Sequence, residues 1–357
     1  MKKLLTLITL IFMMLLTGCG DTKSEIEEYD KAASNDEKSS SAESNNSNSK
    51  GDLVIKMLNV GQGDAILIQV KNKNTLIDTS DADEWSKVQN ELEKANVTKI
   101  DKLILTHPHA DHIGNARKII EQYNVKEVYD NGTEANSPYY KSKSKNKKNA
   151  KGYIDYIEDY NADKSEKQQI KLIHLKDGDS PINLGGSVKF NIFYPTDDAI
   201  KASTQRGFNI NNGSIVGKLT YKKFSMLFTG DAEKEVERDI LAGKHKSELK
   251  STVLKSGHHG SKSSSTKEYL AEVKPKYVVI SAGEPDVEGG NTYGHPHDIA
   301  LNNYRNSDVD DNHIYWTYKN GTITITADGS SDDCDIKVEN NERWLASWLT
   351  EKANRKK

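Results

Sequence analysis

Apolar positions recur with two different spacings along this chain, and together they predict a mixed α/β fold. From residue 53 onward, short apolar runs typical of buried strands are separated by glycine-rich and polar turns. The predicted strands span residues 53–60, 65–70, 75–79, 125–129, 170–175, 187–194, 215–221, 224–228, 252–255, 277–281, 314–318 and 322–326. Helical spacing predicts helices over residues 84–95, 113–123 and 232–241. Strands that alternate with helices, mixed with hairpins, predict two mixed β-sheets faced by helices.

The N-terminal segment, residues 1–19, has the pattern of a bacterial export signal. Lys2 and Lys3 form a positive start, and the apolar run over residues 4–16 is too short to span a bilayer comfortably. The run ends in Leu-Thr-Gly-Cys, which resembles the lipobox of bacterial lipoproteins. We therefore expect Cys19 to carry lipid and to anchor the protein to the cell membrane on its extracytoplasmic face. An ordinary signal peptide with an incidental cysteine is the alternative.

Composition divides the rest of the chain into a tether, one large domain and a short C-terminal segment. Residues 20–50 contain almost no apolar side chains, so they cannot bury enough surface to fold and are expected to form a disordered polar tether. Residues 51–330 are long enough for one domain with a substantial core. Residues 331–357 include an apolar pattern at helical spacing over 344–349. We expect this short amphipathic helix to pack on the domain, with a membrane-surface role as the alternative.

Charge gives little indication of a partner. The chain has 50 basic and 53 acidic residues, with a formal net charge of −3, which is no general sign of nucleic-acid binding. A basic run over residues 141–148 could grip a polyphosphate backbone. Charge runs are usually solvated, so an exposed insertion is the simpler interpretation.

The segment Thr-His-Pro-His-Ala-Asp-His at residues 106–112 carries the strongest chemical signal. It follows an apolar, strand-like run, and alternate residues of such a loop point the same way, so His107 and His109 can share one metal ion. Asp111 and His112 lie at the following turn and face a second ion. Imidazole and carboxylate ligands together suit zinc or manganese, and two such ions can clamp a scissile ester. A histidine-rich surface turn is the alternative.

Three later segments can complete this site. Asp231 follows an apolar strand in the turn Thr-Gly-Asp, where its carboxylate can bridge two cations, although such a turn alone is usually a helix cap. Two further strands each lead into a glycine-containing loop with a pair of histidines. These pairs are His258 with His259, and His295 with His297. Ligands that arrive from several strand ends are typical of a metal site at the edge of a sheet.

With these motifs, the chain resembles metallo-β-lactamase-fold hydrolases of the ComEC type, the soluble domain of bacterial DNA-uptake proteins. The matching motifs are Asn-Val-Gly-Gln-Gly-Asp-Ala at 59–65, the segment at 106–112, Thr-Gly-Asp at 229–231, His-His-Gly-Ser at 258–261 and Gly-His-Pro-His at 294–297. The resemblance implies an αββα sandwich with a dinuclear site at its edge. It also implies metal ligands at His107, His109, Asp111, His112 and Asp231. Because no transmembrane channel segments follow, a direct part in DNA translocation is not expected.

The resemblance leaves the remaining ligands to be assigned. Many enzymes of this fold have a further histidine between the first loop and the Thr-Gly-Asp turn, but the histidine in that interval, His174, looks like an ordinary strand residue. We therefore assign His258 to the first metal site and His295 to the second. His259 and His297 are then candidates for proton transfer, and Asp111 is a further catalytic candidate. Within each pair the order can be reversed.

These expectations favour one function and leave others open. The favoured function is hydrolysis of a phosphodiester outside the cytoplasm by hydroxide held on two divalent ions. Its substrate would be extracellular DNA or a phosphodiester of the cell wall. A lactam or thioester hydrolase is a less favoured alternative. A non-enzymatic, metal-bearing binding lipoprotein linked to DNA uptake is another.

Overall fold

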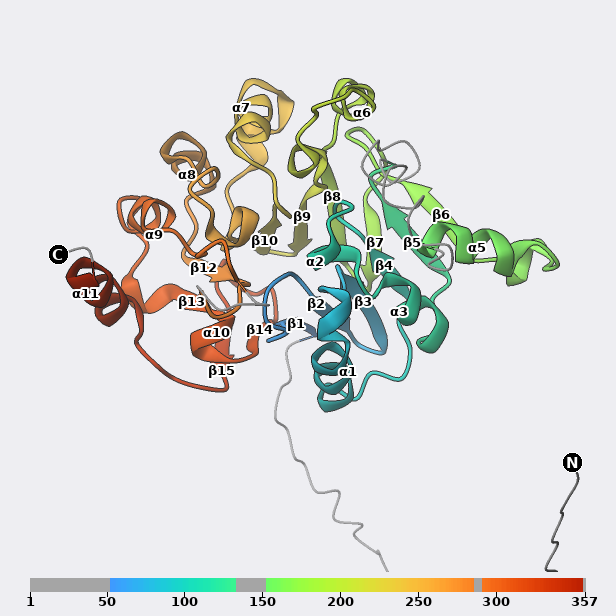
Figure 1. Cartoon of the computed structure of the whole chain (residues 1–357), viewed down its shortest axis with the longest axis horizontal. Coiled ribbons are helices and arrows are strands. Elements are labelled where there is room, and N and C mark those ends of the chain that lie inside the picture. Colours follow the sequence, from blue (N-terminus) through green and yellow to red (C-terminus); the bar gives the residue numbers. More distant parts are fainter. Residues whose placement is uncertain (1–51, 133–151, 286–290, 356–357) are drawn as a thin grey trace, which may run out of the picture. The chain divides into compact units, whose positions relative to one another are not determined.

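The structure, a computed structural model, describes residues 52–132, 152–285 and 291–355. These residues form two β-sheets that face each other, with helices on both outer faces (Figure 1). The predicted lipobox, the polar tether and the basic run over 141–148 lie outside the described residues. None of the helices in the described part has both the length and the apolar character needed to cross a bilayer.

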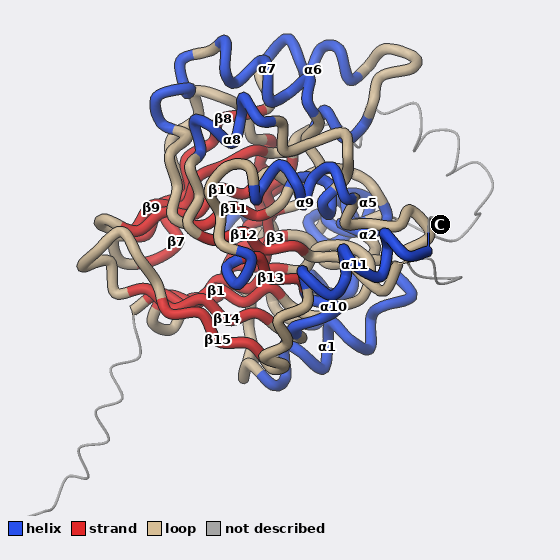
Figure 2. Tube along the Cα trace, turned by 90° about the vertical axis from the view of Figure 1, so that its left-hand side faces the viewer, coloured by secondary structure: helices blue, strands red, loops and turns tan. Residues whose placement is uncertain are grey.

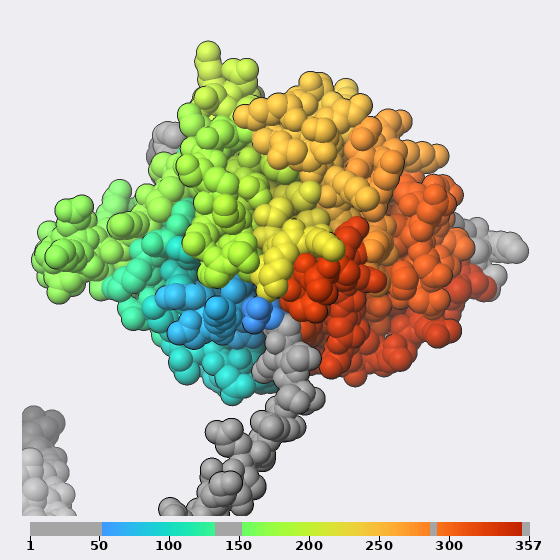
Figure 3. Space-filling model, turned by 180° about the vertical axis from the view of Figure 1, so that it is seen from behind, coloured from blue at the N-terminus to red at the C-terminus, as the bar shows by residue number. Residues whose placement is uncertain are grey.

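The first sheet has eight strands in the described ranges. They are β1 (Leu53–Met57), β2 (Ile66–Val70), β3 (Lys73–Ile77), β4 (Lys102–Ile104), β5 (Glu127–Asp130), β6 (Lys171–His174), β14 (Ile323–Ala327) and β15 (Asp335–Val338). Their order is β15–β14–β1–β2–β3–β4–β5–β6. Because β14 pairs antiparallel with β1, the two ends of the domain meet, and blue N-terminal and red C-terminal residues lie side by side in Figure 3.

The second sheet has seven strands, again within the described residues. They are β7 (Ile182–Gly185), β8 (Val188–Tyr194), β9 (Val216–Tyr221), β10 (Phe224–Phe228), β11 (Val253–Lys255), β12 (Tyr277–Ile280) and β13 (Ile314–Trp316). Their order is β13–β12–β11–β10–β9–β8–β7. The strands from β10 to β13 are parallel, so their C-terminal ends share one edge of the sheet.

Helices cover both outer faces (Figures 1 and 2). On the first sheet lie α1 (Trp85–Lys94), α3 (Ala116–Gln122) and α5 (Tyr153–Asn161). On the second lie α7 (Lys234–Ala242), α8 (Lys267–Val273), α9 (Asp298–Arg305) and α11 (Leu345–Arg355). Shorter helices are α2 (Ala110–Ile113), α6 (Asp197–Ser203) and α10 (Thr317–Asn320), together with the 3₁₀ turns η1 (Ala82–Glu84), η2 (Glu166–Gln168), η3 (Ile210–Gly213), η4 (Lys244–Glu248), η5 (Gly257–Gly260) and η6 (Asp311–His313).

Alternation along the strands explains this four-layer arrangement. In β2, Ile66 and Ile68 point into the core between the sheets, whereas Leu67 points into the core under the first helical layer. Strands that are buried on both faces read as continuous apolar runs, which is why these strands were predicted from the sequence. The structure confirms the predicted α/β fold with two mixed sheets flanked by helices.

Several boundaries differ from the sequence prediction. The helix predicted over 113–123 is divided into α2 and α3 at Gly114, where an added Cβ would lie 2.4 Å from the backbone nitrogen of Ala82. The strand predicted over 314–318 ends at Trp316, whose backbone N–H donates to Asn320 in α10. β7, β15 and several helices were not predicted. The helix around 344–349 packs into the core of the second sheet, as its apolar spacing predicted.

Candidate metal centre

The histidine loop begins where β4 ends at the edge of the first sheet. Leu103 and Ile104 are fully buried, and the chain then leaves the sheet toward α2. His107 is buried, and His109 stands directly before α2 with its ring Nδ1 3.1 Å from His107 Nε2. The first turn of α2 carries Asp111 and the buried His112. The short helix thus brings all four predicted ligands of this segment to one place.

A buried carboxylate, Asp78, orients two of these histidines. Asp78 follows β3 in the left-handed backbone region, with φ +59°. It accepts hydrogen bonds from the backbone N–H of Thr106 (2.8 Å), from Thr106 Oγ1 (2.7 Å) and from His112 Nδ1 (2.8 Å). Thr106 Oγ1 also lies 3.2 Å from His107 Nδ1. Because the threonine hydroxyl gives its proton to Asp78, it can only accept one from His107, so Nδ1 carries the proton in both histidines.

Asp231 approaches from the second sheet. It follows β10 after Gly230, whose positive φ of +48° turns the chain back toward the loop after β4. The Asp231 backbone N–H donates to Ser214 Oγ at 3.0 Å, and the side chain is almost completely buried. Its Oδ2 lies 3.7 Å from His107 Nε2, and its Oδ1 lies 3.2 Å from His112 Nε2. The two carboxylate oxygens therefore face different histidines.

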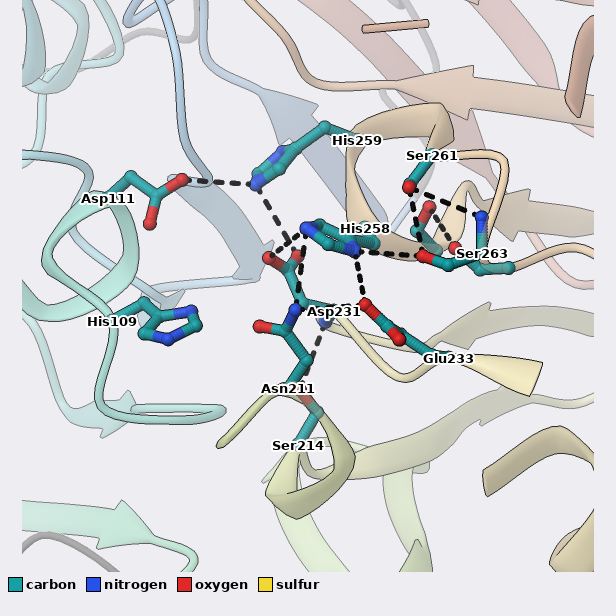
Figure 4. A network of polar contacts seen from close by, with 12 residues as sticks. His109, Asp111, Asn211, Ser214, Asp231, Glu233, His258, His259, Ser261 and Ser263 are labelled. Atoms are coloured by element: carbon teal, nitrogen blue, oxygen red, sulfur yellow. Dashed lines mark hydrogen bonds and ion pairs between the residues drawn. The ribbon is translucent and has the colours of Figure 1, made fainter. Parts of the chain in front are cut away.

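The histidine pair in η5 has diverging side chains. His258 and His259 both have positive φ, +46° and +54°, a conformation that costs free energy in non-glycine residues and is concentrated at functional sites. His259 is buried and donates from Nδ1 to the carbonyl oxygen of Ser281 at 2.7 Å. Its Nε2 then lies 3.3 Å from both His112 Nε2 and Asp111 Oδ2, and 3.4 Å from Asp231 Oδ1 (Figure 4).

His258 points instead toward the open side of the site. Its side chain is 21% exposed, and its Nδ1 lies 3.1 Å from Glu233 Oε1. Its Nε2 lies 3.7 Å from Asp231 Oδ2 and 3.5 Å from Asn211 Nδ2 (Figure 4). Hydrogen bonds from His258 and Asn211 outweigh burial and lower the pKa of Glu233, so this carboxylate stays ionised beside the imidazole.

The donor atoms suit a cation. Two groups, each with its ligand atoms within 4.8 Å of one another, can hold a metal ion among the described residues: Asp64, His112, Asp231 and His259, and His107, His109 and Asp231. Since both Nδ1 atoms are hydrogen-bonded elsewhere, the lone pairs of His112 Nε2 and His259 Nε2 face each other at 3.3 Å. Asp231 Oδ1, buried beside them, accepts no well-aligned hydrogen bond. Lone pairs that converge in this way repel one another unless a cation lies between them.

Electrostatics lead to the same conclusion. Burial lowers the pKa of His112, but Asp231 and Asp78 outweigh it and raise this pKa well above its usual value. Burial likewise opposes protonation of His259, yet Asp231 and Asp111 raise its pKa to about 10. The buried carboxylates thus favour positive charge at this point, which either protons on these rings or a divalent cation can supply.

The chain also matches a protein family whose fold is known for binding metal ions. Residues 58–200 match the model described as the metallo-beta-lactamase superfamily. The chain contains a metallo-β-lactamase domain. Its cluster of histidine and aspartate donors is of the kind that metal-dependent hydrolases use.

Relatives of this metallo-β-lactamase domain include competence proteins. ComE operon protein 3 of Bacillus subtilis (strain 168) is 27% identical over 313 residues, which cover 80% of this chain and 36% of the relative. Competence protein ComA of Neisseria gonorrhoeae is 25% identical over 257 residues, which cover 72% of this chain and 30% of the relative. The chain therefore spans about a third of the length of these relatives. The predicted resemblance to the ComEC type is confirmed, whereas lipoprotein status stays a prediction.

Among solved structures, the metallo-beta-lactamase fold protein YhfI from Bacillus subtilis aligns with a TM-score of 0.46 at 12% identity. The alignment covers 76% of this chain and 100% of that chain.

The candidate metal centre of the metallo-β-lactamase domain lies at the bottom of a cleft of about 820 Å³. Its lining includes Asp111, Asp231, His258 and His259. The predicted residues His295 and His297 also line the cleft, but neither belongs to the two donor groups. The His295 ring centre lies 5.2 Å from that of His258 and 6.0 Å from that of His259. His297 Nδ1 accepts the backbone N–H of Lys262.

Sequence reasoning missed the buried residues that support the donors. Asp78 was not singled out, although it follows a predicted strand. Asp64 appeared only within a family motif, yet it lies in one donor group and forms a buried ion pair with Lys255 at 2.8 Å. Glu233, which precedes α7 and contacts His258, was also missed. A polar residue at the C-terminal end of a predicted strand was the available signal in the case of Asp78. His174 pairs with Asp130, away from both donor groups.

Proposed function

We propose that this chain is a phosphodiesterase that works with two divalent ions, zinc or manganese. The observation that carries the proposal is the orientation of Asp231, whose two oxygens face two separate sets of imidazoles at 3.2–3.7 Å. A carboxylate in this position can bridge two cations, and paired cations are the usual means of clamping the attacking and leaving oxygens of a phosphodiester.

The geometry favours a specific ligand set. His107, His109 and Asp231 Oδ2 would hold one ion, and Asp111, His112, His259 and Asp231 Oδ1 would hold the other. This assignment makes His259, rather than His258, the ligand of the first histidine pair, and it places His259 in the second site, to which His295 was first assigned. It also moves His295 from the ligands to the wall of the cleft. The ion pair with Lys255 balances the charge of Asp64, so we propose that Asp64 supports His259 from behind.

In such a site the ions supply Lewis acidity and a water-derived nucleophile at neutral pH. The chain's own groups orient the reacting atoms. Asp111, half-open to the cleft, can accept a proton from water through the oxygen that does not face His259. Asp78 and Ser281 hold the rings of His112 and His259 so that both Nε2 atoms point into the site.

His258 is our candidate for the general acid. Glu233 Oε1 lies 3.1 Å from its Nδ1 and holds the ring in place, while its Nε2 points toward the cleft near Asp231. A phosphodiester with an alkoxide leaving group needs such a proton donor. His297 remains a second candidate because it lines the same cleft.

We also propose the substrate and the location of the protein. The names of the competence relatives favour DNA, and a cell-wall phosphodiester is the second candidate. Lactam or thioester hydrolysis and a purely binding role remain the alternatives that the test below separates. Cys19 lies outside the described residues, and we propose that it anchors the chain to the extracytoplasmic face of the membrane through lipid.

The test combines metal content with a substrate panel. The purified chain should hold close to two ions and should cleave bis(p-nitrophenyl) phosphate and single-stranded DNA better than nitrocefin. Asp231→Asn should lose at least one ion and several orders of magnitude in turnover. Glu237→Gln is the matched control, since Glu237 is a buried carboxylate on α7 that accepts from the backbone N–H groups of Ser265 and Thr266, just before α8. Full activity of a metal-free Asp231→Asn protein would refute the dinuclear site, and preference for nitrocefin would favour the lactam hydrolase.

A further inference from the structure

The wall of the cleft formed by residues 291–297 presents an aromatic ring beside the metal centre. Within the described residues, Tyr293 and Ile299 are the large hydrophobic side chains that are exposed, at 69% and 55%. Of the two, only Tyr293 lines the cleft. Resting on the proposed phosphodiesterase function, we propose that Tyr293 is a stacking platform for the base of the nucleotide that carries the scissile phosphate.

The Tyr293 ring is held in place without being covered. Its plane lies at 17° to the buried His295 ring, with 5.8 Å between ring centres, which is within the range of offset-stacked aromatic pairs. Asn291 fixes the loop below, because its side chain bonds to both the backbone N–H and the carbonyl oxygen of His295. One face of Tyr293 is therefore supported, and the other can take a flat ring from the substrate at small entropic cost.

Charge directs a nucleotide to this wall. The cleft is also lined by Asp81, Asp83 and Glu84, at η1 just before α1. Asp81 caps the turn through the Asp83 backbone N–H, and Glu84 pairs with Lys87 at 2.7 Å. These carboxylates repel phosphate groups, whereas Lys262 adjoins the segment of Tyr293 through its backbone N–H bond to His297. A phosphate-bearing chain is thus expected to leave the metal centre along the Tyr293 side.

Two serine hydroxyls that also line the cleft favour a base over a sugar ring. Ser261 Oγ bonds to Ser263 Oγ at 2.9 Å and accepts the Ser263 backbone N–H, and Ser263 Oγ lies 3.4 Å from His258 Nδ1. These hydroxyls are engaged within the protein, while carbohydrate recognition needs polar groups that are turned to the ligand. Base stacking needs only the ring face.

The experiment compares two substrates with one leaving group. Thymidine 5′-(p-nitrophenyl phosphate) carries a base, and 2-deoxyribose 5-(p-nitrophenyl phosphate) lacks it. The full-length protein should prefer the thymidine ester by about tenfold in kcat/KM, the order expected for one stacked base. Tyr293→Ala should abolish this preference through a higher KM for the thymidine ester, with kcat nearly unchanged. Tyr293→Phe should retain the preference, and so should Ile299→Ala, which removes the exposed hydrophobic side chain outside the cleft.

Each unexpected result of this experiment would contradict a different claim. Absence of any base preference in the unmodified protein would overturn the platform, while leaving the phosphodiesterase proposal standing. An equal loss on both esters in Tyr293→Ala would also overturn it, and would instead place the sugar or the p-nitrophenyl group on the ring. If neither ester nor bis(p-nitrophenyl) phosphate is cleaved, the proposed function itself is wrong, and the platform falls with it.

Discussion

Replacing Asp78 by asparagine should weaken metal binding although Asp78 is not itself a proposed ligand. Asparagine is nearly isosteric and tolerates the left-handed backbone at this position, so the fold around residue 78 should persist. The amide nitrogen is a donor, however, and it cannot accept the proton of His112 Nδ1, which now bonds to the Asp78 carboxylate at 2.8 Å. His112 would then favour the tautomer with the proton on Nε2, the atom that faces Asp231.

The size of the effect follows from these contacts. Loss of an oriented carboxylate–histidine partner typically weakens metal affinity about 10- to 100-fold, or roughly 1.4–2.7 kcal/mol. Asp78 accepts three hydrogen bonds, and asparagine keeps one acceptor oxygen. Each buried donor left without a partner costs about 1–3 kcal/mol. We therefore also expect a lower free energy of unfolding in the metal-free protein.

The chain offers a closely matched control. Asp130, buried at the end of β5 in the same sheet, also accepts from a backbone N–H, a hydroxyl and an imidazole: Gly132, Tyr153 and His174. His174 has a 54% exposed side chain and belongs to neither donor group. Asp130→Asn should lower stability but keep metal affinity. Affinity can be measured by competition with a chromogenic zinc chelator, and stability by urea unfolding without metal. Equal metal affinity in the two variants would refute the proposed orientation of His112 by Asp78.

Three further predictions address other parts of the chain. His258→Ala and Glu233→Gln should keep both ions yet lose turnover, much more with alkoxide than with p-nitrophenolate leaving groups; metal loss in either variant would contradict the acid role. Gly63→Ala should lower the melting temperature and disturb the centre, because its Cβ would lie 2.2 Å from the Asp111 carbonyl oxygen at a φ of +112°; an unchanged melting curve would argue against this packing. Cys19→Ser should release the protein from the membrane fraction or leave an unprocessed precursor, and unchanged partitioning would count against a lipoprotein.

Much of the architecture could be predicted because the strands are buried on both faces. Runs such as that of β12 between Tyr277 and Ile280 are continuous and apolar, and local pattern is sufficient to find them. β15 was missed because its alternating pattern covers only four residues, Asp335 to Val338, and none of them is fully buried. Its place beside β14 depends on pairing between strands, which periodicity does not reveal.

The candidate site was predictable in its residues and less so in their roles. The segment over 106–112 and Asp231 were found because the chemistry lies in the motif itself. Which of His258 and His259 would bind a metal ion depends on two successive left-handed backbone conformations, which neither residue type suggests. Asp78 acts through the rings that it holds, so it has no motif of its own.

The two halves of the metal centre belong to different sheets. The loop with His107 and His112 leaves the first sheet after β4, whereas Asp231 and His259 follow strands of the second. Neither sheet alone supplies all the donors, so a bound ion is a removable cross-link between them. Any motion that parts the sheets at this edge must release the ion, and the free energy of metal binding therefore adds to the free energy of parting them. Metal supply would then influence how tightly the two sheets are held together at the edge that carries the candidate metal centre.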